Sequence, residues 1–365
     1  MALPTVTLIV TQRERFCLTK PSLESILADY PAYPFELIYV DGNSPPHIAQ
    51  YLRQQAEKYD FITLMRQEHY LRSNEARNLA LSLSKNADYV VFLDNDDIVE
   101  PGWLKPLVDC AEEENAAIVS PLILQNYPQL PEKEVHVAGI KTTWRQRKFG
   151  KKWFEQKQLY YAKKLQEVEE NITRSVMDSV EFHCLLVRRS VFNKVELDNV
   201  FDSLASHTDL CMQVQAQGGV VYLEPSSMIT FLNPRQVNYF APSDLPFYRY
   251  KWSEKATREI FNRCIKKWKL ERKDPSIWAI WRWVIENRQL PIQALVTTGS
   301  QEEKLLEITQ KRWCPGWLRM FLESIVIKRV FPEHGIPENG EKIVNELTEF
   351  VQNRQYSRQP EFVSS

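Results

Sequence analysis

The stretch Tyr89–Asp97 constrains this chain more than any other, because a strongly apolar strand runs directly into three carboxylates. Tyr89–Leu93 is a run of five apolar residues rich in aromatic and β-branched side chains, which predicts a fully buried strand. Asp94, Asp96 and Asp97 follow at once, and ionised carboxylates cannot all be buried without a compensating partner. Carboxylate oxygens suit Mg²⁺ or Mn²⁺, so the sequence predicts a divalent-cation site at the end of this strand. An ordinary acidic turn is the alternative that the same residues allow.

Strands alternate with helices through the first part of the chain. The predicted strands are Thr5–Val10, Phe35–Val40, Phe61–Met65, Tyr89–Leu93 and Ile118–Leu124, and the predicted helices between them are Pro21–Leu27, Ile48–Tyr59 and Asn74–Leu81. This order is typical of βαβ units, so we expect an α/β fold with a mainly parallel, Rossmann-like sheet and helices on both faces. Ligands of such sheets bind at the carboxyl ends of the strands, where Thr11, Asp41 and the Asp94 cluster fall. Because the chain has no Gly-x-Gly-x-x-Gly or Walker-type loop, the pattern favours a nucleotide-diphosphate pocket over a dinucleotide or P-loop site.

The second half of the chain holds a polar insertion, further strands and a helical end. Residues 126–177 predict either a solvated insertion or part of an acceptor-binding rim, with a cluster made of Trp144, Arg145, Arg147, Lys148, Lys151, Lys152 and Trp153. Strands are expected within 180–192 and 218–225, and the helix between them has Asp209 in its first turn. Past about Ala241 the pattern becomes helical. We therefore predict one domain at residues 1–245 and a helical C-terminal region at residues 246–365.

The helix predicted at Trp317–Phe331 allows two interpretations. It is mostly apolar, and it is flanked by the basic residues Lys311, Arg312, Lys328 and Arg329. Burial against the α/β domain is the favoured interpretation, because many tryptophans nearby can cover it. Peripheral contact with a membrane surface through residues 311–331 is the alternative.

Composition narrows the setting in which such a protein works. The formal net charge of −1 gives no bulk field that attracts nucleic acid, so no nucleic-acid partner is expected. No stretch approaches the roughly 18 apolar residues of a membrane span, and Met1–Val10 resembles a strand more than a signal peptide. Six scattered cysteines without metal-type spacing are typical of free thiols in a reducing compartment. We therefore expect a cytoplasmic protein, with peripheral attachment to the inner face of a membrane as an option.

An ordered set of short motifs resembles the family 2 glycosyltransferases, which have the GT-A fold. The motifs, spread over about residues 4–232, are Val40–Ser44, Ala76–Asn78, Phe92–Asp97, Leu186–Arg189 and Thr208–Cys211. The resemblance implies a metal-dependent, inverting enzyme that takes a sugar from a nucleotide-diphosphate donor, expected to be a UDP-sugar. The implied acceptor is a glycan or a lipid-linked glycan, as in polysaccharide biosynthesis. A cation bridging the diphosphate would offset the charge that develops as the anomeric C–O bond breaks.

The same resemblance implies roles for individual residues. Asp96 would contact the metal, and Asp94 would contact the ribose or a metal-bound water. Asp41 would hydrogen-bond the nucleotide base, Thr11 would contact the base through its main chain, and Arg77 would lie near the nucleotide. An ion pair at a helix start, with Glu75 or an aspartate, is the structural alternative for Arg77, because such surface pairs are common and weak.

The chain departs from the family pattern near Asp209. The family usually has Glu-Asp-x-Asp at this position, and the first Asp deprotonates the acceptor hydroxyl, whereas this chain has Ser206 and His207 in the first two places. Imidazole has an ordinary pKa of about 6.5, so His207 can act as the base, with Asp209 to orient it, or complete the metal shell. Loss of activity is the third option, and a non-catalytic relative that binds a nucleotide or glycan is therefore the first alternative function. A nucleotidyltransferase ranks below it, because the first strand is not followed by a glycine-rich loop.

Overall fold

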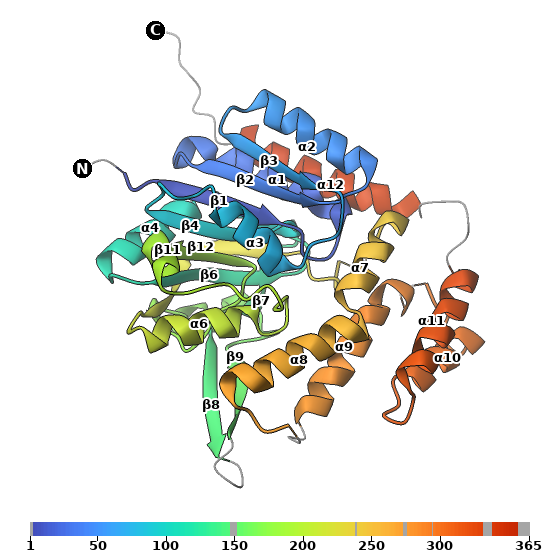
Figure 1. Cartoon of the computed structure of the whole chain (residues 1–365). Coiled ribbons are helices and arrows are strands. Elements are labelled where there is room, and N and C mark those ends of the chain that lie inside the picture. The colour runs from blue at the N-terminus through green and yellow to red at the C-terminus, as the bar shows by residue number, and fades with distance from the viewer. Residues whose placement is uncertain are drawn as a thin grey trace.

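The computed structural model describes residues 3–146, 152–237, 239–272, 276–293, 295–330 and 338–356. Within them, a sheet with helices on both sides is followed by helices that extend to one side of it (Figure 1). Arg147, Lys148 and Lys151 of the basic cluster that the sequence singles out lie outside these residues.

The described strands form one large sheet and a separate hairpin. They are β1 (Val6–Thr11), β2 (Glu36–Gly42), β3 (Ile62–Gln67), β4 (Tyr89–Asp94), β5 (Asp97–Val99), β6 (Ile118–Gln125), β7 (Glu134–Val137), β8 (Ile140–Gln146), β9 (Lys152–Gln158), β10 (Ser175–Val176), β11 (Cys184–Arg188) and β12 (Val221–Phe231). The order across the large sheet is β10-β12-β6-β11-β4-β1-β2-β3, with β5 paired to β12 and β7 paired to β6. Strands β8 and β9 form the hairpin, which projects away from the sheet (Figure 1).

The large sheet is mixed. Strand β1 pairs in parallel with β2 and β4, and β2 pairs in parallel with β3, as the βαβ pattern predicts. Strand β11 is antiparallel to both of its neighbours, β4 and β6. Two parallel strands need a crossover connection between them, usually a helix. The described part of the connection from β6 to β11 instead contains β7 and the β8–β9 hairpin, and the chain re-enters the sheet antiparallel to β6. The expected α/β fold is confirmed, but parallel pairing dominates only among the N-terminal strands.

Helices cover both faces of the sheet. They are α1 (Thr19–Asp29), α2 (Pro46–Lys58), α3 (Ser73–Leu81), α4 (Leu104–Glu113), α5 (Leu165–Val168), α6 (Ser206–Ala216), α7 (Leu245–Lys251), α8 (Glu254–Trp268), α9 (Ser276–Gln293), α10 (Gln301–Thr309), α11 (Gly316–Val330) and α12 (Glu338–Tyr356). Side chains of β4 alternate between two apolar clusters: Tyr89, Val91 and Leu93 pack with α1, α2 and α4, whereas Val90 and Phe92 pack with α3 and α6. Strand β4 is therefore buried on both sides, as its continuous apolar run predicts.

The C-terminal helices pack in two different ways. Helix α12 returns to the α/β domain and lies against α1, where Leu347 and Val351 share an apolar cluster with Leu18 and Ile98. Helices α8 to α11 lie to one side of the sheet (Figure 1). The division into 1–245 and 246–365 stays a prediction.

Helix α11 packs against α9 and α10 and not against the α/β domain. Its inner side combines a buried ion-pair network with an apolar contact: Arg319 contacts Glu254 of α8, Glu323 Oε1 accepts a 2.8 Å hydrogen bond from Arg288 of α9, and Val326 packs in an apolar cluster. Its outer side carries Trp317, Met320 and Phe321, which are 71%, 55% and 58% exposed. The favoured expectation that this helix is buried against the α/β domain is therefore wrong, because a buried ion-pair network determines which side faces inward.

Candidate active site

Three aspartates gather where β4 gives way to β5. Asp94 ends β4, Asp96 lies in the turn, and Asp97 begins β5. All three side chains are buried, and burial raises the pKa of each carboxyl group, that of Asp96 to about 7. Both carboxylate oxygens of Asp96 and both of Asp97 have no hydrogen-bond partner among the described residues. Buried oxygens in this state match what a hard divalent cation binds, so the residues present fit the predicted metal site.

Three arginines surround the aspartates. Arg77 Nη2 lies 3.1 Å and Arg13 Nε 3.6 Å from different oxygens of Asp94, so this carboxylate is held between two guanidinium groups. Arg15 Nη2 lies 3.8 Å from Asp96 Oδ2. Arg77 thus makes the ion pair with an aspartate that the structural alternative expected, but the pair is buried, and the role of Arg77 toward the nucleotide stays a prediction. Asp94 has two cationic partners, whereas the carboxylate oxygens of Asp96 and Asp97 have no hydrogen-bond partner among the described residues.

Sequence reasoning missed a histidine of this site. His183 Nδ1 lies 3.3 Å from Asp97 Oδ1, and the side chains of Asp94, Asp96, Asp97 and His183 form one group that can hold a metal ion. Burial and the Arg13 guanidinium hold the pKa of His183 well below its ordinary value, so the ring is neutral, and its unprotonated nitrogen can either accept a hydrogen bond from Arg13 or bind a cation. Arg13 Nη1 lies 2.8 Å from Nδ1 and 2.7 Å from Nε2 of this ring.

His183 belongs to a second, overlapping group. Glu181 Oε2 lies 3.4 Å from His183 Nε2 and 3.1 Å from His136 Nε2, and Gln158 donates a 2.6 Å hydrogen bond to Glu181 Oε1. Burial opposes ionisation of Glu181, but the imidazoles of His136 and His183 hold its pKa well below its ordinary value. The available sequence signal was the pair Glu181 and His183 in the turn directly before β11, at a predicted strand.

His207 and Asp209 lie in the first turn of α6 but point to different surroundings. His207 lines the large cavity described below, and burial lowers the pKa of its imidazole. Asp209 does not line that cavity. Its Oδ2 accepts a 2.7 Å hydrogen bond from Lys267 Nζ, and its Oδ1 accepts a 3.1 Å hydrogen bond from the Trp268 indole N–H. The structure thus brings His207 to the site and turns Asp209 toward α8.

The residues expected to bind the nucleotide base lie apart from the cavity. Asp41 is fully buried. Its carboxylate accepts hydrogen bonds from Gln12 Nε2 at 3.0 Å and from Arg66 Nη1 at 2.5 Å. It also accepts hydrogen bonds from the backbone N–H and from the hydroxyl of Ser44, both at 2.9 Å. The Thr11 carbonyl accepts a 3.0 Å hydrogen bond from the Asn95 N–H. Both residues lie at strand ends as predicted, and their role toward a base stays a prediction.

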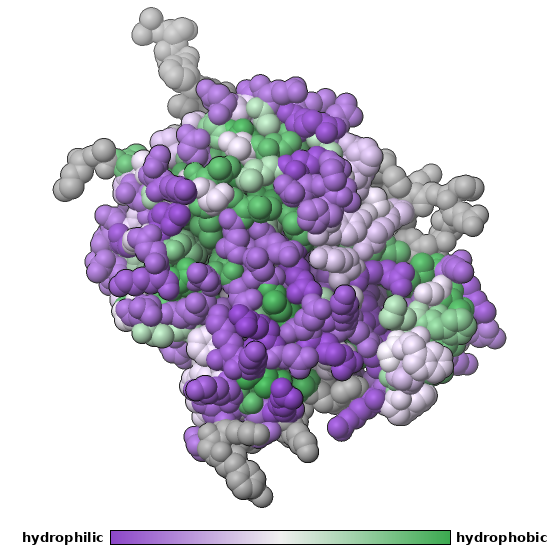
Figure 2. All heavy atoms as spheres, in the orientation of Figure 1, coloured by the Kyte–Doolittle hydropathy of each residue, from purple (hydrophilic) through white to green (hydrophobic). Residues whose placement is uncertain are grey.

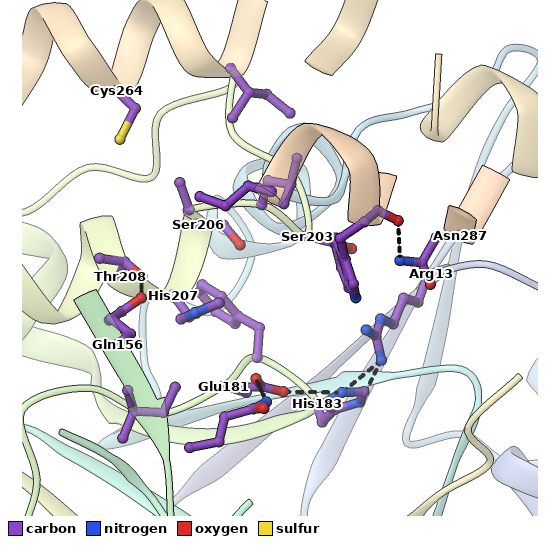
Figure 3. A pocket seen from close by; sticks show the side chains of 18 of the residues that line it. Arg13, Gln156, Glu181, His183, Ser203, Ser206, His207, Thr208, Cys264 and Asn287 are labelled. Atoms are coloured by element: carbon purple, nitrogen blue, oxygen red, sulfur yellow. Dashed lines mark hydrogen bonds and ion pairs between the residues drawn. The ribbon is translucent and has the colours of Figure 1, made fainter. Parts of the chain in front are cut away.

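A cavity of about 890 Å³ lies beside the aspartates. Its polar lining includes Arg13, Arg77, Asp94, Glu181, His183 and His207. Figure 3 shows Glu181 and His183 on one side of it, Cys264 of α8 on the opposite side, and His207 between them. Side chains of β9, α6, α8 and α9 complete the walls. The cavity is thus bounded by the α/β domain, the hairpin and the C-terminal helices together.

Residues 7–195, half of the chain, match the family model of glycosyl transferase family 2. The chain belongs to this family. The glycosyltransferase resemblance drawn from the short motifs is therefore confirmed, and this family match excludes the nucleotidyltransferase alternative.

Two individual proteins illustrate how this family 2 glycosyltransferase relates to others. It is 27% identical over 117 residues to hyaluronan synthase of Pasteurella multocida, a match that covers 32% of this chain and 12% of the length of the synthase. It also resembles the crystal structure of GalNAc-T7 with UDP, GalNAc and Mn²⁺, with a TM-score of 0.52 and 15% identity over 80% of this chain and 58% of the other. At that identity the likeness shows the fold alone, and it agrees with the GT-A fold expected from the sequence.

Proposed function

We propose that this glycosyltransferase transfers a sugar from a nucleoside-diphosphate donor to a hydroxyl acceptor, with inversion at the anomeric carbon and dependence on a divalent cation. The observation that carries the proposal is the set of buried Asp96 and Asp97 oxygens that have no hydrogen-bond partner among the described residues, next to Asp94 and His183, which line a large cavity. The UDP, GalNAc and Mn²⁺ of the GalNAc-T7 structure support a UDP-sugar and a divalent metal for this chain.

Asp96, Asp97 and His183 would hold the cation, and Asp94 would stay anchored between Arg77 and Arg13. When bound, the cation would offset the charge of the departing diphosphate. Carboxylates alone fit Mg²⁺ and Mn²⁺ equally, and the imidazole of His183 favours Mn²⁺.

His207 would act on the acceptor. The acceptor oxygen bonds to the anomeric carbon while the bond from that carbon to the diphosphate breaks, and the electron pair leaves with the nucleoside diphosphate. The proton of the acceptor hydroxyl passes to the neutral imidazole of His207, which lines the cavity. Attack from the side opposite the leaving group inverts the configuration.

We further propose that the acceptor is a glycan or a lipid-linked glycan, and that the enzyme works at the cytoplasmic face of a membrane. In support, Trp313, Trp317, Met320 and Phe321 are more than half exposed on and just before α11, and Figure 2 shows green and pale atoms gathered over α10 and α11. Trp and Phe beside basic residues are typical of interfacial helices. Among the described helices, none is long and apolar enough to cross a bilayer.

The test is turnover of UDP-sugars by the full chain. Incubation with UDP-glucose, UDP-galactose, UDP-N-acetylglucosamine and UDP-N-acetylgalactosamine should release UDP from at least one of them with Mn²⁺ present, and a chelator should stop the release. UDP with Mn²⁺ should also raise the unfolding temperature more than UDP alone, because ligands that bind the native state stabilise it. Absence of both effects would contradict the proposal.

A further inference from the structure

The wall of the cavity opposite the catalytic groups is apolar. It is formed by one side of α8, by Leu270 just after it, and by one side of α9. The residues that carry the argument are Phe261, Ile265, Leu270, Ile280 and Trp283. Among the described residues from Ile260 to Trp283 that line the cavity, only the Trp283 indole and the weakly polar Cys264 thiol have a polar side-chain atom, and polar lining resumes one turn further along α9 with Glu286 and Asn287. The part of the wall from Ile260 to Trp283 offers almost nothing for a sugar hydroxyl to hydrogen-bond.

Charged contacts hold α8 with this side toward the cavity. Lys267 Nζ lies 2.7 Å from Asp209 Oδ2 of α6, and Arg263 Nε lies 2.5 Å from Asp198 Oδ2. Arg72, just before α3, contacts Glu259 of α8. These residues attach the helix to the α/β domain from its polar side, so its apolar side borders the cavity and is not packed onto the sheet.

Several apolar side chains on this wall are incompletely covered. Phe261, Ile265 and Ile280 are half-buried, and Trp283 is 41% exposed, although Trp252 packs edge-on against it with ring centroids 5.3 Å apart. Binding of an apolar ligand to apolar surface inside a cavity is favourable, because it removes both surfaces from water. The same cavity holds His207, Glu181 and Asp94, so a molecule lying on the wall reaches the reacting groups with its other end.

We propose that the acceptor of this enzyme carries a hydrocarbon group, and that this group lies on the α8–α9 wall while the acceptor hydroxyl meets His207. This inference rests on the proposed function, because it assigns the cavity to the acceptor. The acceptor is then an amphipathic molecule, whose polar head carries the reacting hydroxyl and whose hydrocarbon part binds the wall. A wholly carbohydrate acceptor, which would need polar partners along its length, does not match this wall.

The experiment measures the affinity of the full chain for n-alkyl β-D-glucosides, from methyl to octyl, by calorimetry below their critical micelle concentrations. Affinity should rise about fourfold for each methylene that reaches the wall, the value expected for burying one CH₂ group. The variant Ile265→Asn should flatten this dependence on chain length. Leu83→Asn, which changes an exposed apolar residue just after α3 that does not line the cavity, is the matched control and should leave it intact.

Three results would overturn the inference: no measurable binding of octyl glucoside, affinity independent of chain length, or a dependence lost in Leu83→Asn and kept in Ile265→Asn. Unfolding temperatures of both variants check that each is folded. Binding of UDP with Mn²⁺, measured on the same samples, reports separately on the proposed function. If UDP fails to bind while the chain-length dependence holds, the glycosyl-transfer proposal fails and the hydrocarbon site stands.

Discussion

The side-chain amide of Gln12 lies directly against the carboxylate of Asp41, with Nε2 3.0 Å from Oδ1. Its other end, Oε1, accepts a 2.6 Å hydrogen bond from the N–H of Gly42. A primary amide that donates with N–H and accepts with C=O presents the same pattern as the imide edge of uracil. If Asp41 binds a uracil base, as the family resemblance predicts, Gln12 competes with that base for Asp41 and for the Gly42 N–H.

Replacement of Gln12 by Ala should free one acceptor of Asp41 and one donor of Gly42 for the base. The affinity for UDP should then rise by up to about tenfold, the equivalent of one net hydrogen bond, as measured by calorimetry. Gln213→Ala is the matched control, because Gln213 also donates its amide to an aspartate, Asp209, at 2.8 Å, away from the cavity. Weaker UDP binding in Gln12→Ala would mean that Gln12 helps to hold the donor.

Replacement of Asp96 by Asn should lower sugar transfer at least about a hundredfold, because it removes one electrostatic contact of the reaction centre. The fold should survive, since Asn has nearly the same shape and the carboxylate of Asp96 makes no hydrogen bond among the described residues. UDP release from the best donor with Mn²⁺ is the measurement. Asp109→Asn on α4, where Asp109 pairs with Lys105, should leave the rate unchanged. Undiminished turnover in Asp96→Asn would end the metal hypothesis.

His207 should give the reaction a pH dependence centred below the ordinary imidazole range. Burial lowers its pKa, and only the neutral ring accepts a proton, so the rate should rise with pH below about 6.5 and be level above it. His207→Ala should depress turnover and remove this dependence, with UDP–Mn²⁺ affinity nearly unchanged. The exposed His69, changed to Ala, is the control. A collapse of metal-dependent UDP binding in His207→Ala would identify His207 as a metal ligand instead.

Asp209→Asn should affect stability more than chemistry. The buried carboxylate accepts hydrogen bonds from Lys267, which is partly exposed, and from Trp268, so the change should lower the free energy of unfolding by about 1–2 kcal/mol. Turnover below the unfolding temperature should change little, because Asp209 does not line the cavity. Urea unfolding and UDP release on one preparation separate the two effects. A hundredfold loss of rate in a fully stable variant would instead make Asp209 the base.

The outer side of α11 should bind anionic vesicles. The double variant Trp317→Ser and Phe321→Ser should reduce co-sedimentation at low salt at least about tenfold, because two large apolar side chains no longer enter the interface. Leu83→Ser, at a residue 55% exposed after α3, is the control for a general loss of surface hydrophobicity. If the unmodified chain stays in the supernatant at low salt, the membrane proposal is wrong.

Local pattern was enough to predict the elements that position the site. The apolar run Tyr89–Leu93 had to be a buried strand, and the aspartates after it had to lie at its carboxyl end, because period and hydrophobicity act over a few neighbouring residues. The helix start around His207 and Asp209 followed from the same kind of signal. The family motifs then attached a function to those strand ends.

Contacts between distant segments decided the rest. His183 meets Asp97 because β11 pairs antiparallel with β4, a register that no local pattern contains. Asp209 turns away from the cavity because Lys267, 58 residues further along, offers it a charge. Helix α11 exposes its aromatic side because Arg288 of α9 pairs with its Glu323. The sequence by itself determined which segments are strands and helices and where the carboxylates gather. Only the tertiary structure decided which charged and apolar side chains meet, because such pairings depend on the spatial packing of segments that are far apart in the chain.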